Sequence, residues 1–490
     1  MNISDTLWQD FTTAKYTAVI SDLHLCEAEP IHPKFPLWKK FKTREFFFDD
    51  ALADFLSKIV AKAEGQKVEL VLNGDIFDFD SVTSIPDQPV FQISRLEKKR
   101  GLLPQAERST YKIKMILQDH HVFIQAIKKF VADGHRVIFI IGNHDIELHF
   151  SQVQTEILNA LSLDEDSKKR IRFTEWFYIS NKDTLIEHGN QYDPYCVCED
   201  PIHPYVRGYN FISLKLPFGN LACRYIMNGM GFFNPHVDSN YIMSLGQYIR
   251  FFFKYMIRAQ PDLILIWLWG SLVTLKESFV DRLASPLRNP LKIEDRIKEI
   301  AMKANAETRV VRELKELFVD PASSRPYLLV RELWLDRAFF IFLSFYIIFQ
   351  LMVFVRSIFN VSFFWAFVPL FALLPFFLFY SKSIISRVSN YKEPDDHILA
   401  MTSAITGVQR VIYGHTHLAR HEYRGAVEHL NSGCWSPAFL DLECTKPIDQ
   451  KTFVWIAEQS DGLRTAELFK FKNNSWESLS RGSKNNATHE

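Results

Sequence analysis

The sequence predicts an α/β layered domain that is interrupted by a long apolar insertion. Three short apolar runs, "KYTAVISDLHL", "KVELVLNGDIFDFD" and "HRVIFIIGNHDIE", each end in Asp, Asn or His, as strands do when functional side chains follow them. Between them lie stretches with apolar residues at helical spacing, "DDALADFLSKIVAKAEG" and "HHVFIQAIKKFVADG", each closed by a glycine suited to a helix end. This alternation of strands and helices favours an α/β fold.

Two later strands are expected to end in the same way, "DTLIEHGNQYD" and "QRVIYGHTHLAR". If the second strand continues through its histidines, His415 and His417 point to the same side of it, and both imidazoles can converge on one metal ion. A surface turn without function is the alternative. The runs "GAVEHLNSGCW", "TFVWIAEQ" and "TAELFKFK" are expected to complete a sheet, and the polar residues from 473 are expected to be disordered.

Composition narrows the class of protein. A chain of 490 residues exceeds one ordinary domain, so a second body of structure is expected. Lysine plus arginine equals aspartate plus glutamate, 57 each, which gives no support to a general nucleic-acid-binding role. Six scattered cysteines fit a reducing compartment. The opening residues lack the pattern of a signal peptide, so the N-terminal part is expected in the cytoplasm.

Two apolar segments, residues 338–355 and 361–380, contain no charged residue. At about 1.5 Å per helical residue they reach roughly 27 to 30 Å, the thickness of the hydrocarbon core of a bilayer. They predict a transmembrane hairpin, with a helical pair buried in protein as the alternative. Arg356 is the one basic residue in the turn, whereas six basic residues flank the outer ends: Arg325, Arg331, Arg337, Lys382, Arg387 and Lys392. The positive-inside rule therefore predicts cytoplasmic ends and a cytoplasmic main domain.

Other parts of the insertion leave alternatives open. Residues 281–320 are charged and helix-periodic, with an apolar stripe expected to pack on neighbouring elements: Ile293, Ile297, Ile300, Val311, Leu314 and Phe318. Residues 261–275 suit an interfacial or re-entrant segment as well as a core helix. The apolar patches 211–233 and 248–260 suit either the headgroup region of a membrane or the packed core of the insertion.

The residues that follow the expected strands form a set of metal-binding types. In chain order they are Asp22, His24, Asp75, Asn143, His144, His188, His415 and His417. Carboxylate, amide and imidazole donors in such a series match a two-metal hydrolase. His415 and His417 would then close a site that Asp22 and His24 begin.

The motifs "DLH", "GD", "GNHD", "HG" and "GHTH" make the sequence resemble the calcineurin-like metallophosphoesterase superfamily over about residues 16–200 and 395–440. This resemblance implies an α/β fold, a four-layer β-sandwich flanked by helices. The sandwich domain would comprise residues 14–200 and 395–472, split by a mostly helical insertion, 201–394, that carries the transmembrane hairpin at about 338–380. Residues 473–490 would be a disordered tail.

The same resemblance implies roles for the site residues. Asp22, His24, Asp75 and His417 would hold one divalent metal ion. Asp75, Asn143, His188 and His415 would hold the other. His144 would protonate or stabilise the leaving oxygen, with Asp145 holding its tautomer; a helix-capping role is the alternative for His144. Manganese is the expected metal, and iron and zinc are alternatives because these ligands suit all three.

"SDLHL" and "GHTH" also give a distant likeness to the UDP-2,3-diacylglucosamine pyrophosphohydrolases, which usually have arginine where His144 stands and carry a shorter helical lid. "HGNQYD", residues 188–193, is similar to uncharacterised bacterial metallophosphoesterases. The expected reaction is hydrolysis of a phosphoester or pyrophosphate bond, of a lipid-linked substrate at the cytoplasmic membrane face, with membrane lipids as partners and no nucleic acid. The alternatives are a tethered phosphodiesterase or phosphoprotein phosphatase for a soluble substrate, and a non-catalytic membrane scaffold, which the complete ligand set disfavours.

Overall fold

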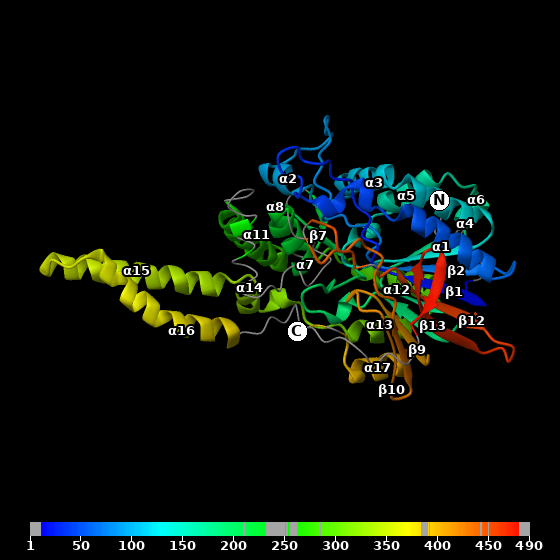
Figure 1. The fold of residues 1–490 in the computed structure, drawn as a ribbon. Helices are drawn as coiled ribbons and strands as arrows, with labels where there is room; N and C mark the ends of the chain where they lie inside the picture. Colours follow the sequence, from blue (N-terminus) through cyan, green and yellow to red (C-terminus); the bar gives the residue numbers. More distant parts are fainter. Residues whose placement is uncertain are drawn as a thin grey trace.

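Two β-sheets packed face to face form the centre of the main body (Figure 1). The computed structural model describes residues 11–208, 211–231, 250, 253–254, 262–284, 286–383, 391, 393–441, 443–448 and 450–479. The first sheet has the order β14-β13-β12-β1-β2-β3-β4: β1 Tyr16–Ile20, β2 Val68–Asn73, β3 Arg136–Ile140, β4 Ile171–Thr174, β12 Thr452–Glu458, β13 Arg464–Lys472 and β14 Ser475–Ser478. The second has the order β10-β11-β9-β6-β5: β5 Phe177–Ser180, β6 Thr184–Glu187, β9 Arg410–Tyr413, β10 Arg420–Arg424 and β11 Val427–Asn431.

Helices cover the outer face of each sheet. Apolar side chains of the first sheet pack against α1 Asp49–Lys62, α3 Ala106–Asp119, α4 His121–Ala132 and α5 Ser151–Leu161. The outer face of the second sheet packs against α12 Ile293–Lys303, α13 Thr308–Glu316 and α17 Asp396–Thr406. The N-terminal half of the chain also contains two short helices, α2 Arg95–Arg100 and α6 Glu165–Lys168. The predicted four-layer sandwich flanked by helices is confirmed.

One of these layers comes from the insertion. The apolar stripe expected within residues 281–320 is present, because Ile297, Ile300, Val311 and Leu314 are buried in the core of the second sheet. The residues of this stripe lie on two consecutive helices, α12 and α13. The predicted boundary of the insertion at 201–394 therefore separates α12 and α13 from the sandwich that they help to build.

The end of the chain also differs from expectation. Residues 475–478 form β14, which pairs antiparallel with β13, and Trp476 packs on the aromatic rings of Phe453 and Trp455. Stacking of large aromatic side chains outweighs the polar character of the flanking residues. The prediction of a disordered tail from residue 473 is wrong for residues 473–479, and residues 480–490 lie outside the described part of the chain.

The first half of the insertion packs against the main body. Its elements are β7 Tyr205–Arg207, β8 Ile212–Leu214, α7 Phe218–Ala222, a π-helical turn Cys223–Met227, α8 Asn228–Met230 and α11 Leu263–Leu283. In the second half, α14 Pro326–Glu332 contacts α11 and leads to the hairpin. Leu214, Leu216, Leu221 and Tyr225 join the core of the first sheet. Of the two expectations for patch 211–233, packed core is therefore correct for these residues, whereas Phe211 and Ile212 are 47% and 50% exposed. Patch 248–260 lies almost wholly outside the described residues.

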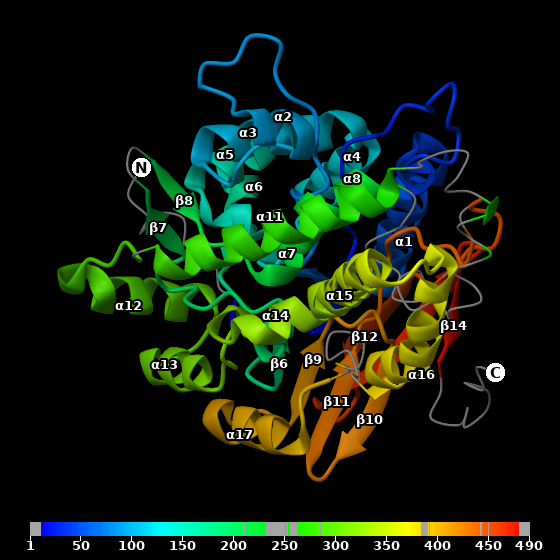
Figure 2. The same cartoon turned by 90° about the vertical axis from the view of Figure 1, so that its left-hand side faces the viewer.

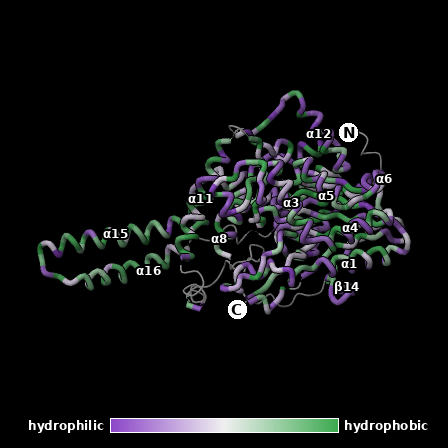
Figure 3. Tube along the Cα trace, turned by 90° about the horizontal axis from the view of Figure 1, so that it is seen from above, coloured by the Kyte–Doolittle hydropathy of each residue, from purple (hydrophilic) through white to green (hydrophobic). Residues whose placement is uncertain are grey.

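A helical hairpin projects from the body, formed by α15 Leu335–Ile358 and α16 Phe367–Ser383 (Figure 1). It is predominantly hydrophobic along its length (Figure 3) and exposes large side chains such as Phe342 and Phe376, 70% and 74% exposed. At the base of the hairpin, Tyr380 Oη donates a hydrogen bond to Asp336, 2.9 Å away. The alternative of a helical pair buried within this chain is wrong.

A buried ion pair joins α3 to the 3₁₀ turn Ile146–His149. Lys112 Nζ lies 3.0 Å from Glu147 Oε1, and each side chain is 1% exposed. Replacing Lys112 with Met leaves a carboxylate buried without its cation, so we expect the free energy of unfolding to fall by about 3 to 5 kcal/mol in urea titrations of the purified protein. Lys114→Met is the matched control, because Lys114 pairs with Glu156 at the surface and its loss should cost less than about 1 kcal/mol. Equal losses for both variants would contradict a buried pair.

Candidate metal centre

All the predicted site residues follow the carboxyl ends of parallel strands. β1, β2 and β3 are parallel neighbours in the first sheet, and β6 and β9 are parallel neighbours in the second. Because parallel strands end at the same edge of a sheet, the loops after them meet at one edge of the sandwich. Backbone bonds tie these loops together: Asp22 N–H donates to Gly74 O, and Gly414 N–H donates to His188 O.

The structure brings the side chains into two adjoining groups of donor atoms. Asp22, His24 and His417 form the first, with Asp22 Oδ1 3.1 Å from His417 Nε2. Asp75, His188 and His415 form the second, with Asp75 Oδ2 3.1 Å from His188 Nε2. A carboxylate oxygen of Asp75 also lies within 4.8 Å of a ring nitrogen of His24, a member of the first group. The Asp75 carboxylate therefore stands between the two groups.

The two histidines of "GHTH" reach these groups in a way that the strand argument did not anticipate. β9 ends at Tyr413, and both His415 (φ 64°) and His417 (φ 58°) have left-handed backbone conformations. The condition that the strand continues through its histidines is therefore not met, and the alternation of side chains along a strand does not apply to them. They reach neighbouring groups instead.

Left-handed backbone conformations recur at three other donor residues of the site. Asp22 (φ 56°), His24 (φ 49°) and Asp75 (φ 52°) share them, although residues with a Cβ avoid this region. Such a conformation costs on the order of 1 to 3 kcal/mol and persists at functional sites where the surroundings enforce it. This backbone strain indicates that the side chains are positioned for function at the expense of stability.

Glycines leave room for the cluster. A Cβ on Gly74, whose φ is 77°, would lie 2.4 Å from Cγ of His188. One on Gly142 would lie 2.3 Å from Oδ1 of Asp75. These clashes explain in physical terms why "GD" and "GNHD" each begin with glycine.

The burial of the donors fits a pair of cations. Asp22, Asp75, Asn143 and His188 are at most 2% exposed, whereas the His417 side chain, 22% exposed, lies toward solvent. Asn143 Oδ1 is buried without a hydrogen-bond partner among the described residues. A buried amide oxygen normally has such a partner, and a cation supplies one. The residues present therefore fit two divalent metal ions.

The electrostatics of the site also fit bound cations. Burial opposes ionisation of Asp75, but His188 and His144 hold the pKa of its carboxyl well below its usual range. Burial likewise opposes protonation of His188, but the carboxylates of Asp75 and Asp22 raise the pKa of that imidazole to about 9. Carboxylates that stabilise a proton on a neighbouring imidazole also stabilise a metal cation bound by the same atoms.

His144 lies at the solvent side of the cluster, with its side chain 12% exposed. Its Nδ1 faces two carboxylates, Asp78 at 3.6 Å and Asp80 at 3.5 Å. Burial lowers its pKa, but Asp75, Asp78 and Asp80 together raise that pKa well above the usual value. The helix-capping alternative is wrong, because the following 3₁₀ turn begins after Asp145 and has no side-chain cap.

Asp145 does not have the predicted role of holding the His144 tautomer. Its carboxylate accepts hydrogen bonds from the backbone N–H groups of Gly142, 2.7 Å, and Ile76, 2.8 Å. Burial and the nearby Asp75 raise the pKa of Asp145 to about 7. Asp145 thus joins the loop after β3 to the loop after β2, and the carboxylates near His144 come from "GDIFDFD", a signal that was visible in the sequence but not used.

Sequence reasoning also missed residues that orient the "GHTH" loop. Asp193 Oδ2 lies 3.1 Å from His415 Nε2, and Glu393 accepts a hydrogen bond from Thr416 Oγ1 at 2.9 Å. A carboxylate beside a ligating imidazole fixes the orientation of the ring. Asp193 ends the motif "HGNQYD", whereas nothing in the local sequence singles out Glu393.

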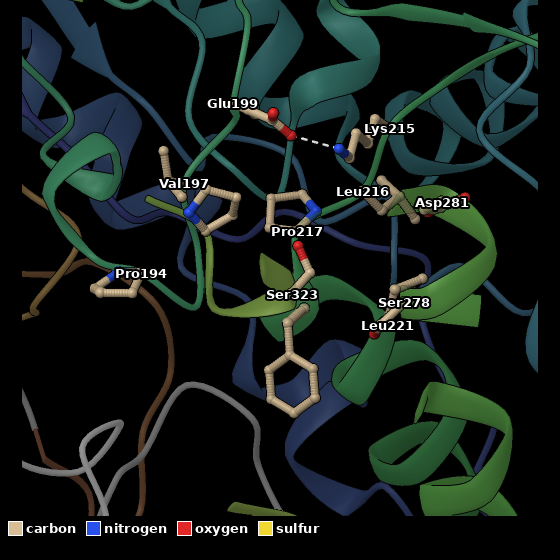
Figure 4. Close-up of a pocket in the computed structure, with 12 residues that line it drawn as sticks. Pro194, Val197, Glu199, Lys215, Leu216, Pro217, Leu221, Ser278, Asp281 and Ser323 are labelled. Atoms are coloured by element: carbon tan, nitrogen blue, oxygen red, sulfur yellow. Dashed lines mark hydrogen bonds and ion pairs between the residues drawn. The ribbon is translucent and has the colours of Figure 1, made fainter. Parts of the chain in front are cut away.

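A separate pocket lies where the insertion meets the loop after β6 (Figure 4). It is lined by Pro194, Val197, Leu216, Leu221 and Ser278 among others, and Lys215 pairs with Glu199 at its edge. None of its lining residues belongs to the donor groups. We therefore assign the chemistry to the strand-end cluster and not to this pocket.

Comparison with known proteins agrees with the geometry. Residues 16–213 match the family model of the calcineurin-like phosphoesterases, and no curated protein matches the chain. The match includes Asp22, Asp75 and His188, and the structure adds His415 and His417 from a segment beyond it. A metal-dependent phosphoesterase is the activity that this family and this donor set support. The part of the chain that builds most of the metal centre, residues 16–213, is therefore similar to the calcineurin-like phosphoesterases.

Proposed function

We propose that the protein is a membrane-anchored phosphoesterase that uses two divalent metal ions, manganese first among them, to hydrolyse a phosphoester or pyrophosphate bond of a lipid-linked substrate at the cytoplasmic membrane face. The observation that carries this proposal is the position of the hairpin in the chain. It lies between β6 and β9, both of which lead directly into donor residues, His188 and His415.

In this proposal, Asp22, His24, Asp75 and His417 hold one ion, and Asp75, Asn143, His188 and His415 hold the other. Two such ions lower the pKa of water and neutralise charge on the phosphoryl oxygens. Asp78 and Asp80 face Nδ1 of His144 and favour the protonated form of its ring. The ring can therefore donate that proton to the leaving oxygen.

Membrane association is supported by three helices that are long and apolar enough to cross a bilayer: α11, α15 and the segment Phe363–Ser381. α15 has 24 residues and so spans about 36 Å. Pro375 lies inside α16, a position that transmembrane helices tolerate. Of the three, the two hairpin helices are the more exposed.

We expect the hairpin to hold the protein in membranes with the main body in the cytoplasm. Alkaline carbonate should leave the protein in the membrane pellet, because transmembrane helices are not released by high pH. In inverted vesicles, a tag placed at Glu490 should be cleaved by added protease. Release by carbonate would contradict the membrane anchor, and a protected tag would contradict the orientation.

A lipid-linked substrate follows from the same placement. A tether for a soluble-substrate enzyme needs no connection to the active site. Here the chain leaves the sandwich beside His188 and returns beside His415, so the base of the insertion stands next to the metal centre. This arrangement would bring the centre toward the membrane surface, where a lipid headgroup lies.

The lipid-linked substrate predicts that kcat/KM rises with acyl-chain length for substrates carrying the same head group in mixed micelles. We expect a short-chain analogue to be hydrolysed less efficiently than the long-chain form, with manganese supplied. Equal kcat/KM for the two forms, or for the free head group, would leave a tethered enzyme acting on a soluble substrate. Hydrolysis of none of the phosphomonoester, phosphodiester and nucleotide-sugar pyrophosphate probes would contradict the enzymatic proposal itself.

A further inference from the structure

α11 has the reverse of the usual polarity of a surface helix. On the side that faces the protein, most of its buried positions carry small or hydroxylated residues: Ser271 and Thr274 are 0% exposed and Ser278 is 3% exposed. Larger apolar side chains, Trp267, Val273 and Leu275, are partly buried against the protein beside them. Gly270 lies so close to the π-helical turn that a Cβ would be 2.7 Å from Tyr225 O. This side packs against α7, α8 and the turn between them, so α11 is docked on the main body.

The outward side of α11 carries mainly large apolar side chains, with Lys276 and Arg282 as exposed charged residues in its C-terminal half. Leu265, Leu272, Phe279 and Leu283 are 68%, 53%, 51% and 69% exposed. Soluble proteins rarely expose a row of such residues along a whole helix, and a contiguous patch of this kind marks a surface for a membrane or a protein partner.

The direction of α11 favours the membrane as the occupant. The hairpin points away from the body in Figure 1, and in Figure 2, where it points toward the viewer, α11 runs across the same face. α11 also contacts α14, which leads directly into α15. If the hairpin is perpendicular to the bilayer, α11 lies along the bilayer surface.

The surroundings of Trp269 fit the boundary between lipid and water. Trp269 is 38% exposed on α11 and lies under two cations from α2, Lys99 Nζ at 6.0 Å and the Arg100 guanidinium at 5.2 Å from its ring centre. Tryptophan and basic residues gather at the headgroup level, where the rings meet acyl chains and the cations meet phosphates.

We propose that α11 is an interfacial helix that rests the main body on the bilayer, and not a third transmembrane span. This proposal rests on the membrane insertion of the hairpin. A spanning α11 would have to leave its packing on Tyr225 and Ile226 and bring Ser271 and Thr274 into hydrocarbon. An interfacial α11 keeps all its protein contacts and buries its exposed apolar side in lipid.

Depth-dependent fluorescence quenching tests this placement in the full-length protein. A fluorescent amino acid replaces Leu272 on α11, Ile347 in the middle of α15 or Leu463 in the turn between β12 and β13, all of which are exposed. Vesicles of phosphatidylethanolamine and phosphatidylglycerol carry nitroxide quenchers either near the headgroup or near the end of the acyl chain.

We expect headgroup-level quenchers to act most strongly on the Leu272 probe, chain-end quenchers on the Ile347 probe, and neither on the Leu463 probe. Stronger quenching of the Leu272 probe by chain-end quenchers would overturn the proposal in favour of a spanning helix. No quenching of the Leu272 probe would overturn it in favour of water or a protein partner. An unquenched Ile347 probe would instead refute the membrane hairpin on which the proposal rests.

A second observation concerns the link between the insertion and His144. Asn220 lies on α7 with 0% exposure, and its Nδ2 donates to Asp80 Oδ2 at 2.5 Å and to the backbone carbonyl of Asn143 at 2.7 Å. The same oxygen of Asp80 lies 3.5 Å from His144 Nδ1. The side-chain amide of Asn220 thus holds both the Asp80 carboxylate, which lies beside His144, and the Asn143 peptide, which precedes His144.

We infer that Asn220 is a positioning residue for His144, which ties the acid function to the docked insertion. Its removal frees the Asp80 carboxylate to rotate away from the imidazole, so the ring of His144 should lose its fixed position. The effect should depend on how much the leaving group needs a proton. A nitrophenolate leaves without one, and an alkoxide does not.

Asn220→Ala should lower kcat for an alkyl phosphoester by about tenfold, a part of the roughly 10² to 10⁴ expected for loss of the acid, and should lower kcat for the nitrophenyl ester much less. KM and metal content should not change. Asn228→Ala is the matched control, because Asn228 donates to the backbone carbonyl of Asp80 and not to its carboxylate; it should not alter the ratio of the two rates.

An equal loss for both esters would overturn the positioning role and leave a structural one. If Asn220→Ala does not fold, Asp80→Asn tests the same link, because it keeps the side-chain size and removes the charge facing His144. A leaving-group effect in His144→Ala but not in these variants would refute the link alone. Absence of the effect in His144→Ala would refute the acid role on which it depends.

Discussion

Asp75→Asn is expected to abolish hydrolysis while the protein remains folded. Asp75 stands between the two donor groups, and its charge is what would hold two cations close to each other. The amide of Asn keeps the shape of the side chain but not the charge. The measurement is kcat at saturating manganese, together with metal content and circular dichroism.

Asp54→Asn is the matched control, because Asp54 is an exposed carboxylate on α1, far in sequence from every donor loop. It should retain normal activity and metal content. Near-normal activity of Asp75→Asn at saturating manganese would show that the two-metal assignment is wrong.

His144→Ala is expected to lower the rate by about 10² to 10⁴ without loss of metal, as removal of a general acid does. Its ring lies at the solvent side of the centre, and Asp78 and Asp80 favour its protonated form. The loss should be smallest with a nitrophenyl ester, whose leaving group needs no proton.

His121→Ala, a change at an exposed histidine at the start of α4, is the control and should leave the rates for both esters unchanged. A loss in His144→Ala that is the same for good and poor leaving groups would remove the acid role from His144.

The sequence predicted the parts of the molecule that depend on local pattern. Each strand that carries a donor is a short apolar run, and its last residues lead directly into Asp, Asn or His. Because parallel strands end at one edge of a sheet, the strand pattern already implied that the loops after β1, β2 and β3, which carry Asp22, Asp75 and Asn143, lie near one another. His188 follows β6 in the second sheet, and the packing of the two sheets brings it beside Asp75.

What the sequence did not predict depends on how loops fold. The left-handed conformations at His415 and His417 send the rings to neighbouring groups, and strand geometry cannot anticipate that turn. Asp145 accepts hydrogen bonds from backbone N–H groups, whereas Asp78 and Asp80 face His144, because the loop after β2 is hydrogen-bonded to the loop after β3.

Tertiary packing decided the remaining differences. An apolar segment such as 211–231 has the same composition whether it meets lipid or protein, and here the proximity of the first sheet makes Leu221 and Tyr225 part of the core. α12 and α13 belong to the insertion in sequence, but the uncovered outer face of the second sheet requires a helical layer, which their apolar stripe provides.

The most direct test of a two-metal phosphoesterase is the metal content of the purified wild-type protein, measured by elemental analysis together with turnover before and after chelation. We expect two divalent ions per chain, loss of hydrolysis when chelator removes them, and recovery of hydrolysis on addition of manganese. A chain that binds no stoichiometric metal, or that hydrolyses phosphoesters equally well after complete removal of its metal, would contradict the account.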